Sequence, residues 1–209
     1  DKVGVGVMVD SCLDCEECNA GLEQYCRNEV VYTYGSPDKH TGLSTYGGYS
    51  GQIVVREEFV LRVPDSLYEF SGAPILCAGI TTYSPLRHHN VGEDSKVGVA
   101  GFGGLGDMAV RLAKAMGAEV TVITTSPDKA EAAKAAGADY VLNAADPQDM
   151  VKHDRAFDLI ISTIPKTHAV DKYLELLKLD GSYVIVGAVE PMHEPYDARI
   201  LLSKRVKIT

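Results

Sequence analysis

The sequence predicts an α/β protein in which a doubly wound parallel sheet follows a smaller unit of short strands and turns. From residue 97 onward, segments with the pattern of buried strands alternate with segments that place apolar residues on one helical face. Near-continuous apolar runs at residues 159–161 and 184–186 are typical of strands buried on both faces. A glycine-rich turn at residues 101–106 joins the first strand to the first helix. These three observations favour a parallel sheet covered by helices on both sides.

The expected elements of the larger part alternate along the chain. Strands are predicted at residues 97–100, 120–124, 140–142, 159–163 and 183–186, with a last strand near Val206. Helices are predicted at residues 105–116, 127–136 and 169–179. Pro127 suits a first helical position, and Gly137 and Gly181 suit the ends of the second and third helices. We therefore expect one domain at residues 1–70 and a second at residues 71–209.

Composition and charge exclude several classes of function. The chain has 209 residues, of which 45% are hydrophobic, so it is long enough to bury a core. Its formal net charge of -9 would repel a phosphate backbone, and no nucleic acid partner is expected. The sequence contains neither an apolar run of about 18 residues nor a leader pattern, so we expect a cytoplasmic protein without a membrane partner.

The glycine turn fits the pattern G-x-G-x-x-G. Gly101, Gly103 and Gly106 occupy the three fixed positions, with Gly104 and Leu105 between the last two. The first glycine permits a tight turn, the second lets the backbone approach a pyrophosphate, and the third allows close helix packing. The helix N-terminus adds unpaired amides and partial positive charge. A tight turn without a ligand is the alternative, but the surrounding alternation of strands and helices favours a dinucleotide site.

The end of the second predicted strand indicates which dinucleotide binds. An NAD enzyme usually offers Asp or Glu there to the ribose hydroxyls. This chain has Thr124, Thr125 and Ser126, with Lys129 following. Hydroxyls and a lysine can bind a 2′-phosphate, whereas a carboxylate would repel it, so NADP is favoured over NAD. The alternative is a polar loop in which Ser126 caps the next helix.

Four of the five cysteines form a dense cluster. Cys12, Cys15, Cys18 and Cys26 follow the spacing C-x2-C-x2-C-x7-C, and we call residues 12–26 the cysteine lobe. Four thiolates leave no open position on a tetrahedral ion, which predicts a structural zinc site. A zinc ribbon that binds nucleic acid and an iron–sulfur cluster are disfavoured by the acidic loop, the last spacing and the attached α/β part. Cys77 stands apart in an apolar segment, where a cysteine is usually buried and inert.

Taken together, these motifs resemble the medium-chain dehydrogenase/reductase superfamily, and within it the zinc-containing cinnamyl alcohol dehydrogenase group. The resemblance covers essentially the whole chain. It is carried by the cysteine lobe, Gly-Gly-Tyr-Ser at 47–50, Leu-Cys-Ala-Gly-Ile-Thr at 76–81, the glycine turn and Val-Gly-Ala at 186–188. It implies a partial GroES-like catalytic domain joined to a Rossmann domain. It also implies a second, catalytic zinc in the cleft between them, which polarises the substrate oxygen during hydride transfer.

The resemblance also assigns roles to single residues. It implies that Cys77 is one ligand of the catalytic zinc. The residues that it places at the nicotinamide end are Thr81, Thr163, Val186, Gly187 and Ala188. The expected activity is reversible hydride transfer between NADP(H) and a primary alcohol or aldehyde. The alternatives are a zinc polyol or mannitol dehydrogenase, a non-catalytic NADP-binding relic, and a zinc-ribbon interaction module.

Two departures from the family pattern affect these expectations. The family's other catalytic-zinc ligands lie in an N-terminal Cys-His-Ser-Asp stretch and a Gly-His-Glu stretch, and neither occurs here, so this polypeptide by itself is expected to be inactive. Relatives also commonly have His after the last glycine, where this chain has Asp107. A carboxylate near a pyrophosphate is repulsive, so weaker cofactor binding is expected. By analogy, the family further implies a homodimer formed through the last strand of the sheet.

Overall fold

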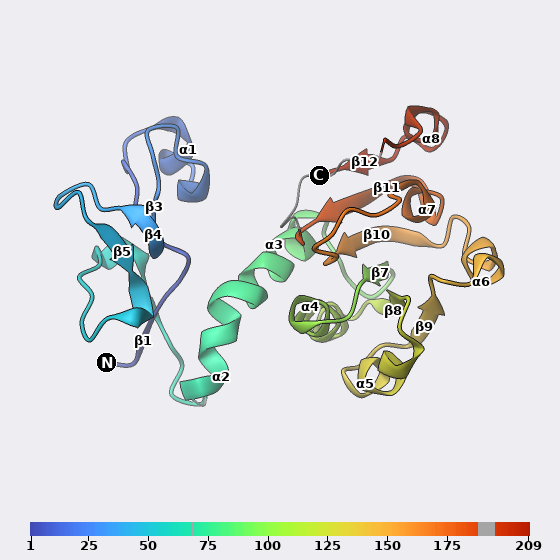
Figure 1. Ribbon diagram of the computed structural model, residues 1–209, viewed down its shortest axis with the longest axis horizontal. Helices are drawn as coiled ribbons and strands as arrows, with labels where there is room; N and C mark the ends of the chain where they lie inside the picture. The colour runs from blue at the N-terminus through green and yellow to red at the C-terminus, as the bar shows by residue number, and fades with distance from the viewer. Residues whose placement is uncertain (68, 188–194) are drawn as a thin grey trace. The chain divides into compact units, whose positions relative to one another are not determined.

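The computed structural model describes residues 1–67, 69–187 and 195–209. The chain forms two compact units, Asp1–Cys77 and Ala78–Thr209 (Figure 1). The expected domain limits at residues 70 and 71 stay a prediction, because a compact unit is defined by its contacts and not by folding on its own. Each unit is therefore described by itself.

The smaller unit consists of short strands that pair two by two in antiparallel fashion. β1 (Val3–Val5) pairs with β6 (Val60–Arg62), β2 (Met8–Asp10) with β3 (Val31–Tyr32), and β4 (Tyr34–Pro37) with β5 (Ser44–Tyr46). The helical segments are α1 (Glu16–Asn19), the 3₁₀ turns η1 (Glu23–Tyr25), η2 (Gly47–Tyr49) and η3 (Glu57–Phe59), and α2 (Glu69–Pro74). A π-helical turn, η4 (Ile75–Gly79), follows α2.

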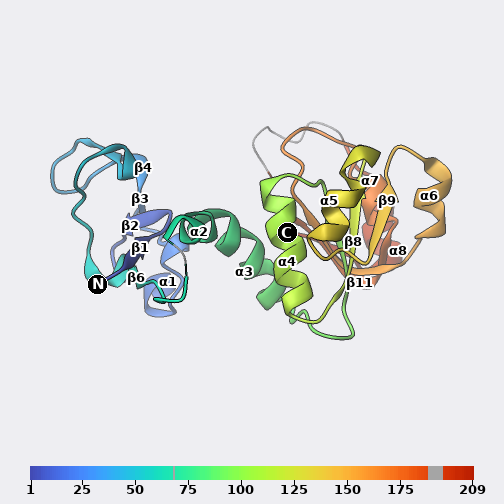
Figure 2. The same cartoon turned by 90° about the horizontal axis from the view of Figure 1, so that it is seen from below.

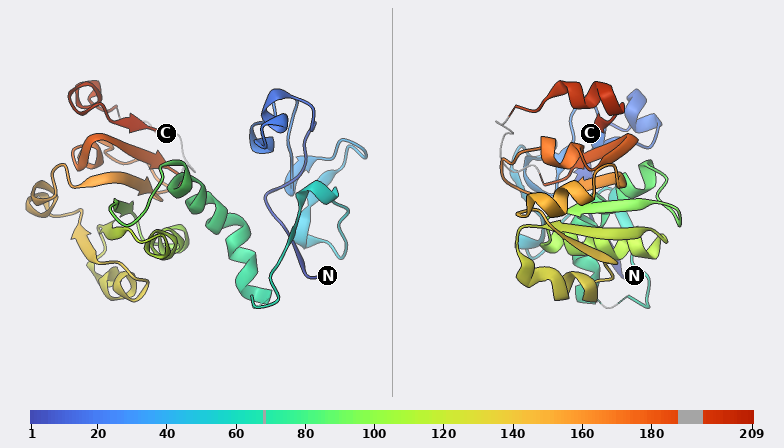
Figure 3. Two further views of the ribbon diagram at one scale, coloured as in Figure 1. Left: turned by 180° about the vertical axis from the view of Figure 1, so that it is seen from behind. Right: turned by 90° about the vertical axis from the view of Figure 1, so that its right-hand side faces the viewer.

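The larger unit is built on one six-stranded sheet with the order β12-β11-β10-β7-β8-β9. Its strands are β7 (Lys96–Ala100), β8 (Glu119–Thr124), β9 (Tyr140–Asn143), β10 (Phe157–Ser162), β11 (Leu177–Ile185) and β12 (Lys207–Ile208). Every neighbouring pair is parallel, which confirms the predicted sheet. Figures 1 and 3 show β12 at one edge and β9 at the other. The order reverses between β7 and β10, and sheets of this kind bind ligands beside such a switch point, at the carboxyl ends of the strands.

Helices cover both faces of this sheet and enclose two apolar cores. They are α3 (Ile80–His88), α4 (Gly104–Ala115), the 3₁₀ turn η5 (Pro127–Lys129), α5 (Ala130–Ala135), α6 (Pro147–Lys152), α7 (Asp171–Leu174) and α8 (Ala198–Lys204). One core joins the sheet to α3, α4 and α5, and the other joins it to α6, α7 and α8. Figure 2 shows α4 and α5 on one side of the strands and α6 and α8 on the other. Along β10, Leu159 and Ile161 enter the first core and Ile160 enters the second, which explains the continuous apolar run.

The third predicted helix is wrong beyond its first turn. α7 ends at Leu174, and residues 177–179 belong to β11, which pairs with β10 as far back as Phe157. Gly181 accordingly lies inside a strand and does not end a helix. Leu177 is fully buried and pairs with Phe157 of β10. Tertiary pairing therefore outweighs the local helical pattern.

No helix in the described ranges has both the length and the apolar character that crossing a bilayer requires.

One buried charged side chain holds the last helix in place. Lys204, at the end of α8, is 4% exposed. Its Nζ donates to Glu175 Oε2 at 2.7 Å, to the Glu175 carbonyl at 2.6 Å and to Asp154 Oδ1 at 3.2 Å. A buried ammonium is stable only when it is paired, so these contacts tie α8 to the segments that end α6 and α7.

Replacing Lys204 tests this anchor. Lys204→Met keeps the buried stem but leaves the Glu175 carbonyl without its charged donor, so the free energy of unfolding should fall by about 1–3 kcal/mol. Urea denaturation measures the change, and Lys172→Met, at an exposed position on α7, is the control. Equal stability of the two variants would contradict an anchoring role.

Candidate functional site

The glycine turn lies at the carboxyl end of β7. β7 ends at Ala100, and α4 begins at Gly104 with Gly103 as its N-cap. Gly101 has a φ of +88°, which favours glycine. Its amide donates to the Ile123 carbonyl at 2.9 Å and so ties the turn to β8. The predicted order of strand, glycine turn and helix is confirmed.

Two glycines of the turn are enclosed and two are open. A Cβ on Gly106 would lie 2.4 Å from the Gly101 carbonyl oxygen, and one on Gly101 would lie 2.8 Å from Thr163 Oγ1. At Gly103 and Gly104 an added Cβ would meet nothing within 4 Å. No side chain caps the helix at Gly103. The backbone at the start of α4 therefore borders open space and its first amides have no side-chain cap, which suits an anionic ligand.

The ends of β10 and β11 meet this turn. The Thr163 amide and Oγ1 donate to the Ala100 carbonyl at 2.8 and 3.0 Å. The amides of Val186 and Gly187 donate to the Ser162 carbonyl at 2.9 and 3.1 Å. A Cβ on Gly187 would lie 2.5 Å from the Thr163 carbonyl carbon. The structure thus gathers three of the residues expected at the nicotinamide end, and their contact with a cofactor stays a prediction.

The four residues expected at the 2′-phosphate lie at the end of β8 and just after it. Thr124 is buried and its Oγ1 accepts from the Ser126 amide at 3.1 Å, whereas Thr125 is exposed. Ser126 is the N-cap residue of η5 but its side chain makes no cap hydrogen bond, which weakens the alternative of a mere helix cap. The exposed Lys129 donates from Nζ to the Phe102 carbonyl at 3.1 Å. This bond brings the ammonium to the glycine turn.

Asp107 does not stand alone in the first turn of α4. Arg111 binds it in bidentate fashion, with Nε at 2.9 Å from Oδ2 and Nη2 at 3.1 Å from Oδ1. The hydrogen bond to Asp107 raises the pKa of the Arg111 guanidinium, which stays charged. Because the pair is neutral, it reduces the repulsion that Asp107 alone would exert on a phosphate. Arg111 is not among the residues predicted from the sequence, although its spacing of four residues from Asp107 on a helix indicates such a pair.

The four lobe cysteines lie close enough to share one ion. Their Sγ atoms are all within 4.8 Å of one another. Three of the pairs are 3.5, 3.9 and 3.9 Å apart, far too long for disulfide bonds. Sulfur ligands about 2.3 Å from a tetrahedral zinc stand roughly 3.8 Å apart. The spacing therefore fits a single four-coordinate ion and leaves no room for the several irons of a cluster.

Polar groups around the sulfur atoms favour a thiolate at Cys12, whereas the crowding of the sulfur atoms opposes one at Cys15. The Cys15 amide and Asn28 Nδ2 donate to Cys12 Sγ at 3.3 and 3.5 Å. A hydrogen bond from the Asp14 amide is the main cause that lowers the pKa of Cys12 to about 6. The Cys18 amide lowers the pKa of Cys15, but burial and the neighbouring sulfur atoms outweigh it and raise that pKa to about 12. Four thiolates side by side thus need a cation, and these residues fit zinc.

The remaining predicted residues are not gathered in this way. Cys77 lies in η4 and is exposed, so the sequence-based expectation of a buried thiol is wrong. Within the described part of the chain, the lobe is the one group of three or more ligand side chains close enough for a metal, and Cys77 is not in it. Thr81 is half-buried on α3. Ala188 lies outside the described residues.

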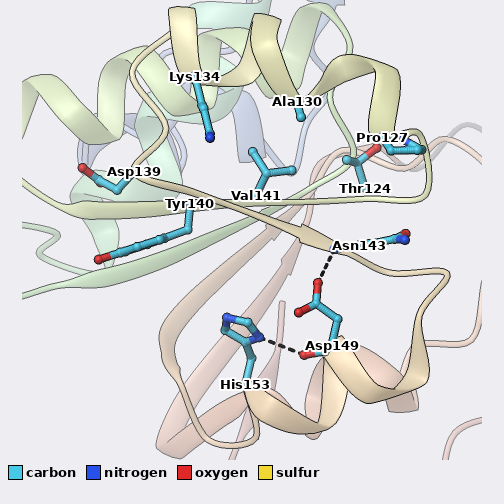
Figure 4. A pocket seen from close by; sticks show the side chains of 10 residues that line it. All are labelled: Thr124, Pro127, Ala130, Lys134, Asp139, Tyr140, Val141, Asn143, Asp149 and His153. Carbon is cyan, nitrogen blue, oxygen red and sulfur yellow. Dashed lines mark hydrogen bonds between the residues drawn. The ribbon is translucent and has the colours of Figure 1, made fainter.

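A hollow of about 480 Å³ runs along the free edge of β9, between α5 and α6 (Figure 4). Lys134 enters it from α5, and His153 lies on the α6 side, where its Nδ1 lies 2.8 Å from the Asp149 carbonyl. The other lining residues are Thr124, Pro127, Ala130, Asp139, Tyr140, Val141, Asn143 and Asp149. Thr124 alone is shared with the predicted cofactor residues. The hollow is therefore separate from the glycine turn and is not where the sequence places a ligand.

Comparison with known proteins agrees with these motifs. A family model described as "Zinc-binding dehydrogenase" matches residues 104–209. The NADP-dependent alcohol dehydrogenase C 1 of Mycolicibacterium smegmatis is 52% identical over 211 residues, which cover 100% of this chain and 60% of that protein.

Two solved structures share the fold at similar coverage. A cinnamyl alcohol dehydrogenase from Sorghum bicolor matches with 42% identity and a TM-score of 0.93, over 100% of this chain and 59% of its own. CAD from Helicobacter pylori, solved as a complex with NADP(H), matches with 40% identity and a TM-score of 0.87, over 99% of this chain and 59% of its own. The resemblance seen in the sequence is confirmed, and the chain spans about 60% of the length of these proteins.

Metal analysis tests the lobe. The purified chain should contain one zinc ion, and cobalt exchanged for it should give the intense visible bands of a tetrahedral thiolate site. Cys15→Ala should lose the ion because three thiolates no longer close the tetrahedron, whereas Cys77→Ala should retain it. Retention of zinc in Cys15→Ala, or its loss in Cys77→Ala, would contradict the four-cysteine site.

Proposed function

This chain belongs to the zinc-binding dehydrogenase family, and on that premise we propose that it carries the NADP(H)-binding part of an alcohol dehydrogenase. The reaction is reversible hydride transfer between NADP(H) and a primary alcohol or aldehyde. One observation carries the proposal. Lys129 reaches the Phe102 carbonyl, so the cation expected at the 2′-phosphate and the turn expected at the pyrophosphate adjoin. A bound NADP(H) would present both phosphate groups to this one corner of the sheet.

Different residues of the chain would contact different parts of the cofactor. The open backbone at Gly103 and Gly104 and the amides that follow it would hold the pyrophosphate. Thr125, Ser126 and Lys129 would hold the 2′-phosphate, while Thr124 shapes the turn from its buried position. Thr81, Thr163, Val186, Gly187 and Ala188 would line the nicotinamide end. The nicotinamide supplies the hydride chemistry, and the protein fixes its position.

Two metal roles complete the proposal. The cysteine lobe would hold a structural zinc, which closes a segment with few apolar contacts of its own. Cys77 would be one ligand of a catalytic zinc, a Lewis acid toward the substrate oxygen. This sequence lacks the two stretches that supply the family's other ligands. We accordingly expect the chain by itself to bind NADPH without turning over an alcohol.

The partners follow from the same proposal. The substrate is a small alcohol or aldehyde, and we propose a cytoplasmic homodimer joined through β12, which lies at the edge of the sheet. A panel of aromatic and aliphatic primary alcohols alongside mannitol would separate the proposed activity from a polyol dehydrogenase. NADPH binding without turnover of any substrate by a zinc-loaded full-length protein would support the non-catalytic alternative.

Cofactor titration tests the 2′-phosphate site. The chain lacks Trp, so bound NADPH can be followed by its own fluorescence. NADPH should bind more tightly than NADH. Lys129→Ala should lower the affinity for NADPH by about tenfold, which is the value of one charged hydrogen bond, and leave the affinity for NADH unchanged. Lys134→Ala, one turn further along the chain and facing the hollow, is the matched control. Preference for NADH, or equal effects of the two lysine variants, would contradict the assignment.

A double-mutant cycle tests the Asp107–Arg111 pair. Arg111→Gln leaves the Asp107 carboxylate without its positive partner. The affinity for NADPH should therefore fall by about three- to tenfold, and by more at low salt. Adding Asp107→Asn should restore the affinity of the parent. The effect of Arg111→Gln on NADPH affinity is measured both in the parent and in Asp107→Asn. Equal effects would mean that the two charges act independently and would contradict the proposed role of the pair.

A further inference from the structure

We infer that Tyr183 and His168 form a latch that positions the loop between β10 and α7 at the cofactor site. The loop comprises residues 163–170, and its role toward the cofactor rests on the proposed function. Tyr183 lies in β11 and His168 in the loop itself, so one hydrogen bond spans two separate segments. Both are positioning residues, because neither belongs to the residues expected to touch the dinucleotide.

The first end of the loop is fixed at the glycine turn. Thr163 donates twice to the Ala100 carbonyl, and its Oγ1 also lies 3.2 Å from the Gly101 carbonyl. Gly101, Gly106 and Gly187 leave no space around this point for an added Cβ. Any displacement of the loop therefore reaches the turn directly.

His168 holds the other end of the loop through both ring nitrogens. Nδ1 lies 2.8 Å from the Lys166 carbonyl, and Nε2 lies 2.7 Å from the Tyr183 hydroxyl. A carbonyl only accepts, so Nδ1 carries the hydrogen and Nε2 of the neutral ring accepts from the phenol. Burial raises the pKa of Tyr183, which keeps this phenol protonated and able to donate. The direction of the bond is thus set by the Lys166 carbonyl.

Ser162 provides an independent sign that this phenol belongs to a polar chain. Its hydroxyl is fully buried and has no hydrogen-bond partner in the described part of the chain. Two residues after Ile160 on β10, Ser162 faces the same side of the sheet as Tyr183, which pairs with Ile160. The Tyr183 oxygen, having donated to His168, retains a lone pair that can accept from Ser162, whose hydroxyl offsets part of the rise that burial causes in the pKa of Tyr183. A buried hydroxyl is costly without a partner, and the phenol is the group on hand.

Ring packing alone does not account for the arrangement. His168 meets Tyr173 edge to face with ring centroids 5.5 Å apart, and Tyr173 meets Tyr183 at 5.9 Å. Tyr173 is buried like Tyr183, but among the described contacts its hydroxyl makes no hydrogen bond to His168. The two tyrosines therefore share the packing and differ in the bond. This difference supplies a matched control.

The experiment compares Tyr183→Phe with Tyr173→Phe in the zinc-loaded chain. Hydrogen exchange at the backbone amides of residues 164 and 166–170 should accelerate by about fivefold or more in Tyr183→Phe and stay near the parent rate in Tyr173→Phe. NADPH affinity should fall by about fivefold in Tyr183→Phe, whereas adenosine 2′,5′-bisphosphate, held at the β8 side, should bind within about twofold of the parent. His168→Gln, which restores an acceptor near the Nε2 position, should recover affinity that His168→Leu loses.

Each outcome of this experiment supports or overturns the proposed latch. Equal exchange and equal affinities in the two tyrosine variants would overturn it. So would an equal loss for NADPH and the bisphosphate, which would indicate general destabilisation. If the parent chain binds no NADPH, the proposed function fails. The exchange rates then decide whether Tyr183 holds the loop, and the cofactor part of this inference falls with the function.

Discussion

The structure depends on the close approach of three backbone segments at the carboxyl edge of its parallel sheet. The glycine turn after β7, the start of the loop after β10 and the residues after β11 pack with no space for a Cβ at Gly101, Gly106 or Gly187. Thr163 lies between these segments, and its hydroxyl donates to the Ala100 and Gly101 carbonyls. These contacts leave Gly103 and Gly104 open at one fixed place. The proposed cofactor site follows from that packing.

The proposed cofactor site and the cysteine lobe are stabilised by different interactions. The sheet of the larger unit is buried on both faces by two apolar cores, so its edge is rigid before any ligand arrives. The cysteine lobe has only four residues in α1 and three in η1, with little apolar surface of its own. Its order would come from a metal that joins Cys12, Cys15, Cys18 and Cys26. Loss of the metal should therefore affect the lobe and leave the sheet intact.

The sequence predicts what is periodic or locally spaced, and misses what tertiary contacts decide. The buried strands, the glycine turn and the cysteine spacing are local patterns, and the structure contains them where expected. α6 and α8 went unpredicted because each is short, although Asp146 and Asp197 cap them by accepting from the amides two residues on. The early start of β11 depends on pairing with β10, and the Lys129–Phe102 and His168–Tyr183 bonds span 27 and 15 residues. No local pattern in the sequence encodes contacts of that separation.

The central claim is that NADP(H) occupies the corner formed by the glycine turn and the end of β8. Amide chemical shifts recorded on an isotope-labelled chain during NADPH addition test it most directly. The account predicts the largest changes at residues 103–106, 125–126 and 187. Saturable changes confined to Tyr140, Asp149 and His153, which line the hollow at the edge of β9, would contradict it.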